Sequence, residues 1–444
     1  MAGKMRKRKE TATEGRMAIE SDVLVIGGGL AGLTAALSAS EEGSHVRLLS
    51  YKQSTLRNAS GLIDILGYAP DGERPLTDPY AVIPDLPEDH PYRTVGVERI
   101  REAMGLFDDA VPAYSGEHTK RNALVTTHVG TVKPTARYPA SMTAALASDD
   151  RGMLLVGFDS LVDFDAPLAA ATLQKSGVPF SVRGVTVEFP GNLRADAKIT
   201  RYAKLLESDE TTRKRLAAAV QSHLDGEPRV GFPAVLGDTQ TERVREELAD
   251  ALGTAVFEVP MSPPSLPGIR LEERLFSALS ETGASIETGN PVVAYDGSDG
   301  GGTGNDGSSG SDRIECVSVE KNGAKIPYSA EEYVLATGGL VGKGVNSNRE
   351  RVYEPIFDCP IQRSENRYDW FDDAVFGDHP FARFGVHTDE TLRPVDHREN
   401  VVFENLRAAG SVLGGYDFAA EKSGSGVSIA TGYMAGMTAA QEAL

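Results

Sequence analysis

Cysteine is scarce in this chain, since only Cys316 and Cys359 occur among its 444 residues. The two lie far apart and in no Cys-x-x-Cys spacing, which excludes a disulfide framework and an iron–sulfur cluster held by this chain alone. No apolar run is long enough to cross a bilayer. We therefore expect a protein of a reducing compartment that holds no metal and has no transmembrane segment.

Positive charge is also in short supply. Aspartate and glutamate number 64 against 45 lysines and arginines, which gives a formal net charge of -19. Such a surface argues against nucleic acid or an anionic membrane as a direct partner. Arginine outnumbers lysine, and the acidic excess is typical of proteins from concentrated salt, where screening reduces self-repulsion. An ordinary acidic soluble protein is the alternative interpretation.

The stretch from Asp22 to about Ser40 combines an apolar run, a glycine turn and a segment rich in alanine and leucine. The apolar run predicts a buried parallel strand, and residues 30–40 predict a helix. Glycines fall in the turn on the spacing of a dinucleotide fingerprint: Gly27, Gly28, Gly29 and Gly32. This spacing permits a tight turn and the approach of a phosphate to the helix N-terminus. We predict a nucleotide site here, although a turn without a ligand would have the same sequence.

A carboxylate is missing where a Rossmann site usually holds the adenosine ribose. Residues 45–49 predict the second strand, and Ser50, Tyr51 and Lys52 follow it. The next carboxylate, Asp64, lies well downstream. A cofactor without adenosine needs no such group, so FMN is favoured, with FAD as the alternative.

Two later stretches complete a flavin pattern. Residues 333–339 form an apolar strand that ends in Ala-Thr-Gly-Gly, and residues 406–415 end a further strand in Ala-Ala-Gly-Ser. A helix predicted at about 427–440 follows a Ser-Gly-Ser-Gly turn, and its positive N-terminus suits the flavin edge where charge collects on reduction. Beyond the first turn, the predicted cofactor contacts are Ser60, Gly61, Thr337, Gly338, Gly410, Ser411, Gly424 and Gly426.

The pattern predicts an α/β fold in which a Rossmann-like flavin-binding domain carries an inserted α+β domain. We expect the flavin-binding domain to consist of residues 21–90 and 330–444, and the insert of residues 91–329. A stretch of glycine, serine and aspartate at 296–312 predicts a flexible segment within the insert. Residues 1–20 are basic and lack an apolar core, which predicts a disordered tail and no secretory signal.

Two loops of the predicted insert have open interpretations. The prolines of residues 259–270 predict a rigid, extended loop that ends at Arg270, with a helix from about Leu271. Arg270 can present its guanidinium to a phosphate or carboxylate, or it can form an ordinary ion pair. Lys133 lies in a turn-like segment, residues 130–135, which is either a ligand contact or a surface hairpin.

With these residues in view, the chain resembles the B-subunit family of anaerobic glycerol-3-phosphate dehydrogenases from about Ser21 to its end. Runs shared with that family are Ile26–Leu33, Ser60–Leu66, Asp163–Phe164, Leu168–Ala171, Pro263–Ser265, Gly268–Leu271, Phe384–Val386, Thr388–Pro394 and Gly410–Gly415. The proline loop and the Thr-Asp-Glu-Thr-Leu-Arg-Pro run are the distinctive ones. The basic tail, the segment 296–312, the acidic surface and the less glycine-rich Gly424-Ser425-Gly426 turn depart from the family.

The resemblance implies FMN, a larger FAD-containing catalytic subunit and an iron–sulfur subunit that anchors the complex at the cytoplasmic face of the cell membrane. It implies oxidation of sn-glycerol 3-phosphate to dihydroxyacetone phosphate, with electrons passed to quinone through the partners. For this reaction the candidate residues are Arg270 and Arg393 for the phosphate and His387 as the base. A histidine held by Asp389 is the structural alternative for His387.

Two other functions stay open at this point. A self-sufficient FAD-dependent reductase of the fumarate-reductase type would need the missing ribose carboxylate. A non-catalytic electron-transfer or assembly subunit would bind flavin and turn over nothing alone.

Overall fold

The computed structural model describes residues 17–70, 72–191, 193, 197–298 and 312–444. Most of the predicted basic tail and of the flexible segment 296–312 lies outside these residues. The described part has two hydrophobic cores, each built on its own β-sheet. Within it, no helix is long and apolar enough to cross a membrane.

The first core is built on a seven-stranded sheet with the order β11-β2-β1-β14-β13-β12, in which β19 also pairs with β14. The strands are β1 (Ile19–Ile26), β2 (Val46–Ser50), β11 (Ser285–Thr288), β12 (Val292–Ser298), β13 (Arg313–Lys321), β14 (Ala324–Leu335) and β19 (Leu406–Ala408). The pairs β11–β2, β2–β1, β1–β14 and β14–β19 are parallel, and β12, β13 and β14 are antiparallel neighbours. Residues 23–26 are all buried, as expected for a parallel strand covered on both faces.

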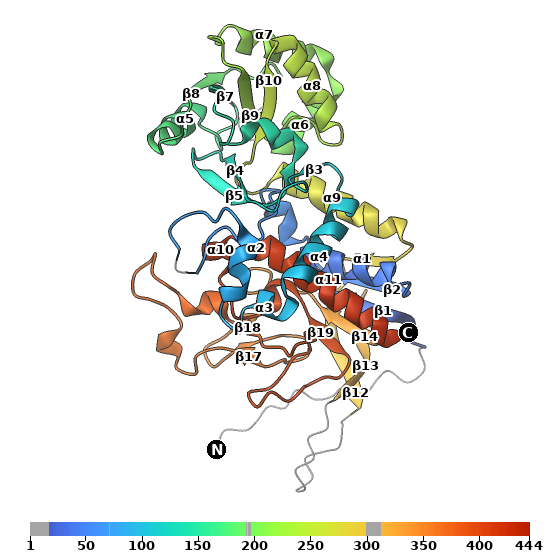
Figure 1. Cartoon of the computed structure of the whole chain (residues 1–444). Helices are drawn as coiled ribbons and strands as arrows, with labels where there is room; N and C mark the ends of the chain where they lie inside the picture. Colours follow the sequence, from blue (N-terminus) through green and yellow to red (C-terminus); the bar gives the residue numbers. More distant parts are fainter. Residues whose placement is uncertain (1–16, 71, 192, 194–196, 299–311) are drawn as a thin grey trace.

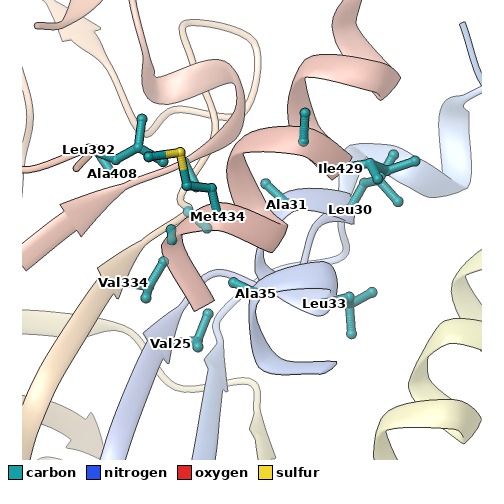
Figure 2. Close-up of a cluster of buried hydrophobic side chains, with 14 of the residues drawn as sticks. Val25, Leu30, Ala31, Leu33, Ala35, Val334, Leu392, Ala408, Ile429 and Met434 are labelled. Atoms are coloured by element: carbon teal, nitrogen blue, oxygen red, sulfur yellow. The ribbon is translucent and has the colours of Figure 1, made fainter. Parts of the chain in front are cut away.

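Two helices rich in small residues pack tightly beside this sheet (Figures 1 and 2). They are α1 (Leu30–Glu41) and α11 (Gly424–Ala443). A Cβ added to Gly432 would lie 2.4 Å from the Ala31 carbonyl oxygen, and one at Gly436 would lie 2.1 Å from that of Ala35. Glycine therefore allows the two helix backbones to approach each other closely.

Three further helices, of four residues or more, border the first core: α2 (Pro79–Val82), α3 (Pro91–Val95) and α4 (Val97–Ala110). Helix α9 (Leu266–Glu281) also packs there through Leu271, Leu275 and Leu279. Short elements complete this half of the chain: β15 (Asn346–Ser347), β16 (Val352–Tyr353), β17 (Ile361–Gln362), β18 (Gly385–Val386) and α10 (Phe418–Glu421).

The second core, at the top of Figure 1, is a four-stranded sheet with the order β10-β9-β7-β8. Its strands are β7 (Met153–Phe158), β8 (Val182–Val187), β9 (Arg229–Pro233) and β10 (Ala255–Val259). Its helices are α5 (Ala166–Lys175), α6 (Ile199–Ser208), α7 (Glu210–Gln221) and α8 (Thr241–Leu252). All of its strand pairs are parallel, because each pair of consecutive strands is joined through a helix.

This parallel sheet differs from the α+β insert that the sequence predicts, while the α/β class and the Rossmann-like domain are confirmed. Antiparallel strand pairs within residues 91–329 lie outside this sheet: β4 (Ala123–Thr126) pairs with β5 (Val132–Thr135), β3 (Tyr114–Ser115) pairs with β6 (Tyr138–Pro139), and β12 pairs with β13 in the first sheet. The interrupted pattern of residues 92–291 hid the alternation of strand and helix.

Core membership also differs from the predicted limits of the insert, 91–329, at both ends. Helices α3 and α4 contribute buried residues to the first core, and β11, β12 and β13 belong to the first sheet. The reason is long-range pairing, because β14 pairs antiparallel with β13 through its first part and parallel with β1 along most of its length. No change in amino-acid composition marks the point where the chain returns to the first sheet. The domain limits themselves stay a prediction.

Local predictions from periodicity agree with the structure, with one exception. The helix predicted at 30–40 is α1, the strand predicted at 45–49 is β2, and the helix predicted from 427 begins as α11 at Gly424. The exception is residues 259–270, where α9 already begins at Leu266. Pro267 lies in the first turn of that helix, where its missing N–H has no intrahelical partner in any case.

The packing of α1 on α11 predicts that Gly436→Leu lowers the free energy of unfolding by about 1–3 kcal/mol or more. The added side chain would meet the α1 backbone at Ala35, so one helix must move. Denaturant unfolding in concentrated KCl measures the change. Gly105→Ala on the exposed face of α4 is the control, because a Cβ there meets nothing within 4 Å and removes backbone entropy from the unfolded chain. Equal stability of the leucine variant and the wild type would contradict the close packing.

Candidate flavin and substrate site

The turn between β1 and α1 requires its glycines for two physical reasons. Gly27 has a φ of +124°, and a Cβ on it would lie 2.1 Å from the Ala336 carbonyl oxygen. A Cβ on Gly32 would lie 1.8 Å from the carbonyl oxygen of Gly27, and one on Gly28 would lie 2.4 Å from the Ser50 hydroxyl. The turn, the first helical turn and the end of β14 are therefore in direct contact.

The N-terminus of α1 is open towards an anion. Gly29 is its N-cap, no side chain caps it, and a Cβ at Gly29 would meet no atom within 4 Å. The first N–H groups of a helix have no intrahelical acceptors, and they carry the positive end of the helix dipole. Close by, the Thr337 hydroxyl is buried and has no partner among the described residues. Free donors, open space and a buried hydroxyl together fit the phosphate end of a flavin nucleotide.

The second and third predicted motifs meet this turn. The Gly339 N–H donates to the Ser411 hydroxyl at 3.0 Å, which joins the segment after β14 to the segment after β19. Gly410 has a φ of +78°, and a Cβ on it would lie 2.5 Å from the Cβ of Ala31 in α1. The structure thus brings Gly27, Thr337, Gly338, Gly410 and Ser411 to one end of the first sheet.

The remaining predicted cofactor residues form a second, adjoining group at the N-terminus of α11. The Gly426 N–H donates to the Asp64 carbonyl oxygen at 2.8 Å, and the Asp64 N–H donates to the Ser425 hydroxyl at 2.7 Å. A Cβ on Gly426 would lie 2.2 Å from the Tyr92 hydroxyl. These contacts hold the segment with Ser60 and Gly61 against the turn that contains Gly424 and Gly426.

A pocket of about 430 Å³ lies where this segment faces the hairpin β4–β5 and the chain after β10. Its lining residues are Ser60, Leu62, Tyr68, Thr127, His128, Val129, Thr131, Val132, Lys133, Pro134, Pro260, Met261 and Lys422. Ser60, Tyr68 and Lys422 come from segments around the flavin motifs, and the others, apart from Leu62, come from residues 127–134 and 260–261. Such boundaries between cores are common places for small-molecule sites.

Two lysines give the pocket a positive wall. Lys133 Nζ lies 2.6 Å from Asp64 Oδ2, and this carboxyl is buried. Burial raises the pKa of Asp64, and the Lys133 ammonium acts against that rise. Lys422 has a φ of +51°, and its Nζ donates to the Ala419 carbonyl oxygen at 2.5 Å. An ammonium group has three N–H donors, so Lys133 can bind the Asp64 carboxylate and still donate to a further anion.

His128 faces the pocket in a defined tautomer. Its Nδ1 lies 3.1 Å from the Pro260 carbonyl oxygen, which can only accept, so Nδ1 carries the proton. Its Nε2 lies 2.6 Å from the Ser262 hydroxyl and accepts from it. Burial lowers the pKa of His128, against the Pro260 carbonyl and Asp163, which raise it. The lowered pKa favours the neutral imidazole, whose Nε2 lone pair accepts from the Ser262 hydroxyl in this structure.

The three residues predicted from the sequence for chemistry lie outside the lining of this pocket. Arg270 donates to Glu258 Oε2 at 2.7 Å and also to the Gly237 carbonyl oxygen, within the second core. Arg393 pairs with Asp389 at 2.8 Å, and His387 Nε2 lies 3.4 Å from Glu399 Oε1 and not beside Asp389. Their functional roles stay predictions.

The sequence interpretation missed His128 and Lys422 as site residues and left Lys133 open. Residues 130–135 do contribute to a hairpin, and Lys133 reaches the pocket from it. A Thr-Thr-His-Val run before a glycine carries no spacing signal, and Lys422 precedes its helix without any motif of its own. Across the described residues no group of three histidine, cysteine or acidic side chains could hold a metal ion, and both cysteines are free thiols.

Comparison with known proteins supports a flavin-binding domain. The family model described as an FAD binding domain matches residues 22–427. The B-subunit of a probable anaerobic glycerol-3-phosphate dehydrogenase from Halobacterium salinarum is 62% identical over 437 residues, which cover 96% of this chain and 99% of that protein. The B-subunit of the anaerobic glycerol-3-phosphate dehydrogenase from Aliivibrio fischeri is 30% identical over 93% of this chain and 94% of its own length.

Two solved structures also align with the chain. The 3-ketosteroid Δ1-dehydrogenase of Sterolibacterium denitrificans covers 95% of this chain and 99% of its own, with 10% identity and a TM-score of 0.42. A flavocytochrome c3 fumarate reductase covers 96% and 79%, with 12% identity and a TM-score of 0.36. Family membership therefore rests on the sequence relatives. The chain belongs to the FAD-binding-domain family of flavoproteins and, within it, to the B-subunit family of anaerobic glycerol-3-phosphate dehydrogenases.

Proposed function

We propose that this chain is the FMN-containing subunit of a complex that oxidises sn-glycerol 3-phosphate to dihydroxyacetone phosphate. The complex would pass the electrons to quinone through a larger FAD-containing subunit and an iron–sulfur subunit, at the cytoplasmic face of the membrane. The observation that carries the proposal is the pocket with Lys133 and Lys422 beside Ser60 and the α11 N-terminus. Its volume and positive wall suit a three-carbon phosphate, and its position borders the predicted flavin contacts.

The two lysines are the proposed phosphate ligands. A phosphate monoester carries close to two negative charges at neutral pH and binds ammonium groups through charge-assisted hydrogen bonds. Thr127 and Thr131 line the same pocket, and because their hydroxyls are hydrogen-bonded to each other at 2.8 Å, the pair can supply one hydroxyl donor. Arg270 and Arg393, the phosphate ligands predicted from the sequence, already bind Glu258 and Asp389, so the lysines replace them in this proposal.

His128 is the proposed proton acceptor. Oxidation of the C2 alcohol requires that the hydroxyl proton leaves oxygen and that a hydride, with two electrons, leaves carbon, which creates the carbonyl. A bound flavin supplies the acceptor for that hydride. The Nε2 lone pair of His128 would take the proton after the substrate hydroxyl has replaced the Ser262 hydroxyl, which donates to Nε2 in this structure.

FMN is the proposed cofactor because the end of β2 offers no ribose carboxylate. Ser50, Tyr51 and Lys52 follow there, and the Ser50 hydroxyl lies close to Gly28 and within 3.4 Å of the Lys52 carbonyl oxygen. The α1 N-terminus would hold the single phosphate, and the segments at Thr337 and Gly410 would flank the ribityl chain.

Mass spectrometry of the cofactor released from the purified chain tests this choice. We expect FMN bound at about one per chain, because the α1 N-terminus provides one phosphate position. The protein should be purified in concentrated KCl, since its acidic surface needs screening to remain compact. Release of FAD would contradict the FMN proposal, and absence of any flavin would favour the assembly role.

The lysine assignment predicts that Lys133→Gln and Lys422→Gln each weaken binding of glycerol 3-phosphate about tenfold or more, because each removes a charge-assisted hydrogen bond. Isothermal titration of the purified chain measures the Kd. Lys204→Gln on the exposed face of α6 is the matched control and should bind as the wild type does. If Arg393→Gln weakens binding and both lysine variants do not, the arginine predicted from the sequence holds the phosphate instead.

The histidine assignment predicts that His128→Gln lowers kcat/KM of the assembled complex by about 10²–10⁴ while the Kd for glycerol 3-phosphate changes little. His118→Gln on the surface is the matched control. The neutral imidazole is the active form and its pKa lies below the usual 6.5. Wild-type kcat/KM should therefore rise with pH up to that lowered pKa and stay level above it, with Asp163, Lys133 and Lys422 as the charged neighbours.

A readout without turnover separates this role from a structural one. Glycerol 3-phosphate should slow acylation of His128 by diethyl pyrocarbonate, as read by peptide mass spectrometry, because the substrate covers Nε2. Unchanged acylation, or wild-type kcat/KM in His128→Gln, would exclude His128 as the proton acceptor.

A further inference from the structure

A long loop connects two short paired strands on one side of the first core. Strand β17 pairs with β18, with Ile361 opposite Val386 and Gln362 opposite Gly385, so residues 363–384 form the connection of this hairpin (orange in Figure 1). Most hairpin connections have about two to five residues, and longer ordered loops are usually functional. We call residues 363–384 the β17–β18 loop.

The β17–β18 loop exposes large apolar side chains. Phe376 is fully exposed, and Tyr368 and Val375 are 84% and 81% exposed. Together with Phe371 and Phe381 they make five of the fourteen large apolar side chains that are exposed among the described residues. Exposed apolar residues that occur singly need no explanation, but a concentration in one loop marks an interaction site.

Hydrogen bonds and ring packing give this loop a defined shape. Trp370 Nε1 donates to the Ser364 carbonyl oxygen at 2.8 Å, and the Phe381 N–H donates to the Trp370 carbonyl oxygen at 3.0 Å. The Trp370 ring packs edge-on against Phe384 at 5.8 Å between centroids. Trp370 therefore holds the loop to the body of the first core. The exposed aromatic side chains beside it are carried by a hydrogen-bonded backbone.

The negative charge of the loop favours a partner with a basic surface. Residues 363–384 contain five acidic residues and three arginines, so the loop carries a net negative charge. Asp378 is paired with Arg383 at 2.7 Å, and Asp369, Asp372 and Asp373 surround the exposed rings in the sequence. An anionic membrane surface would repel such a loop. A protein face with an apolar centre and a basic rim complements it.

The base of the loop is hydrogen-bonded to the segment that follows the predicted flavin contacts. The Gly415 N–H donates to the Arg383 carbonyl oxygen at 3.0 Å, and the Gly414 N–H donates to the Val386 carbonyl oxygen at 3.1 Å. These two glycines follow closely on Gly410 and Ser411 in the chain, and the latter pair are predicted flavin contacts. The base of the loop is therefore fixed to the segment of the predicted flavin contacts, which favours a partner that exchanges electrons with the flavin.

We propose that the β17–β18 loop is the docking surface for the electron-accepting iron–sulfur subunit, which attaches through an apolar groove bordered by lysine or arginine. The inference rests on the proposed function, since that function supplies the partner. Phe376 and Val375 are the anchors that enter the groove, because they are the most exposed apolar side chains of the loop besides Tyr368. The aspartates orient the partner through its basic rim.

Assembly of the full complex tests this surface. The chain is co-expressed with the other two subunits in a halophilic host, and the iron–sulfur subunit that co-elutes in high salt is quantified. Val375→Ser with Phe376→Ser should weaken its association about tenfold or more. Val162→Ser with Leu168→Ser is the matched control on the second core, where these side chains are 79% and 64% exposed, and it should assemble as the wild type does.

The outcomes are distinct. Wild-type assembly of the loop variant would overturn the proposal, as would loss of the larger flavoprotein subunit alone. A wild-type chain that dimerises by itself and becomes monomeric in the loop variant would assign the loop to self-association. If neither of the other subunits associates with the wild type, the proposed complex fails as a whole. Unchanged binding of glycerol 3-phosphate by the loop variant shows that its fold and pocket are intact.

Discussion

Close backbone approach at glycine is the constraint on which the rest of this structure depends. In the β1–α1 turn, in the segment after β14 and in helix α11, a Cβ on glycine would overlap the backbone of a neighbouring segment. Gly27 and Gly432 illustrate it: the first meets the chain after β14, and the second meets the α1 backbone. Because the segments are far apart in the sequence, these contacts close the first core and bring the predicted cofactor residues together at the same time.

Close packing at a glycine also determines where residues of the second core reach the pocket. Gly61 has a φ of +79° and lies against Pro267 at the start of α9, which leads from β10 back to the first core. The chain therefore crosses between the cores next to the segment that contains Ser60. The hairpin β4–β5 faces that crossing and brings Lys133 to Asp64 and His128 to Ser262. A pocket bordered by both cores follows from this path of the chain.

Charge and apolar surface are distributed unequally over the molecule. The chain is strongly acidic as a whole, yet the pocket has lysines on its wall and the β17–β18 loop exposes aromatic rings. In concentrated salt, long-range repulsion between surface carboxylates is screened, while contacts at short range and apolar burial persist. Recognition by such a protein depends on local sites of this kind, since its net charge attracts few partners.

Much of the local structure followed from the sequence itself. Glycine spacing and apolar runs determined β1, α1, β2 and α11, because these elements depend on residues that are neighbours in the chain. The glycine motifs also predicted residues of a flavin site, and those after β1, β14 and β19 lie together in the structure. Only the tertiary structure decided the parallel sheet of the second core, the membership of α4 and β11–β13 in the first core, and the lining of the pocket. Arg270 shows why: its rigid loop was visible in the sequence, but its partner Glu258 was not, since a side chain meets its partners through contacts between segments that no local pattern records.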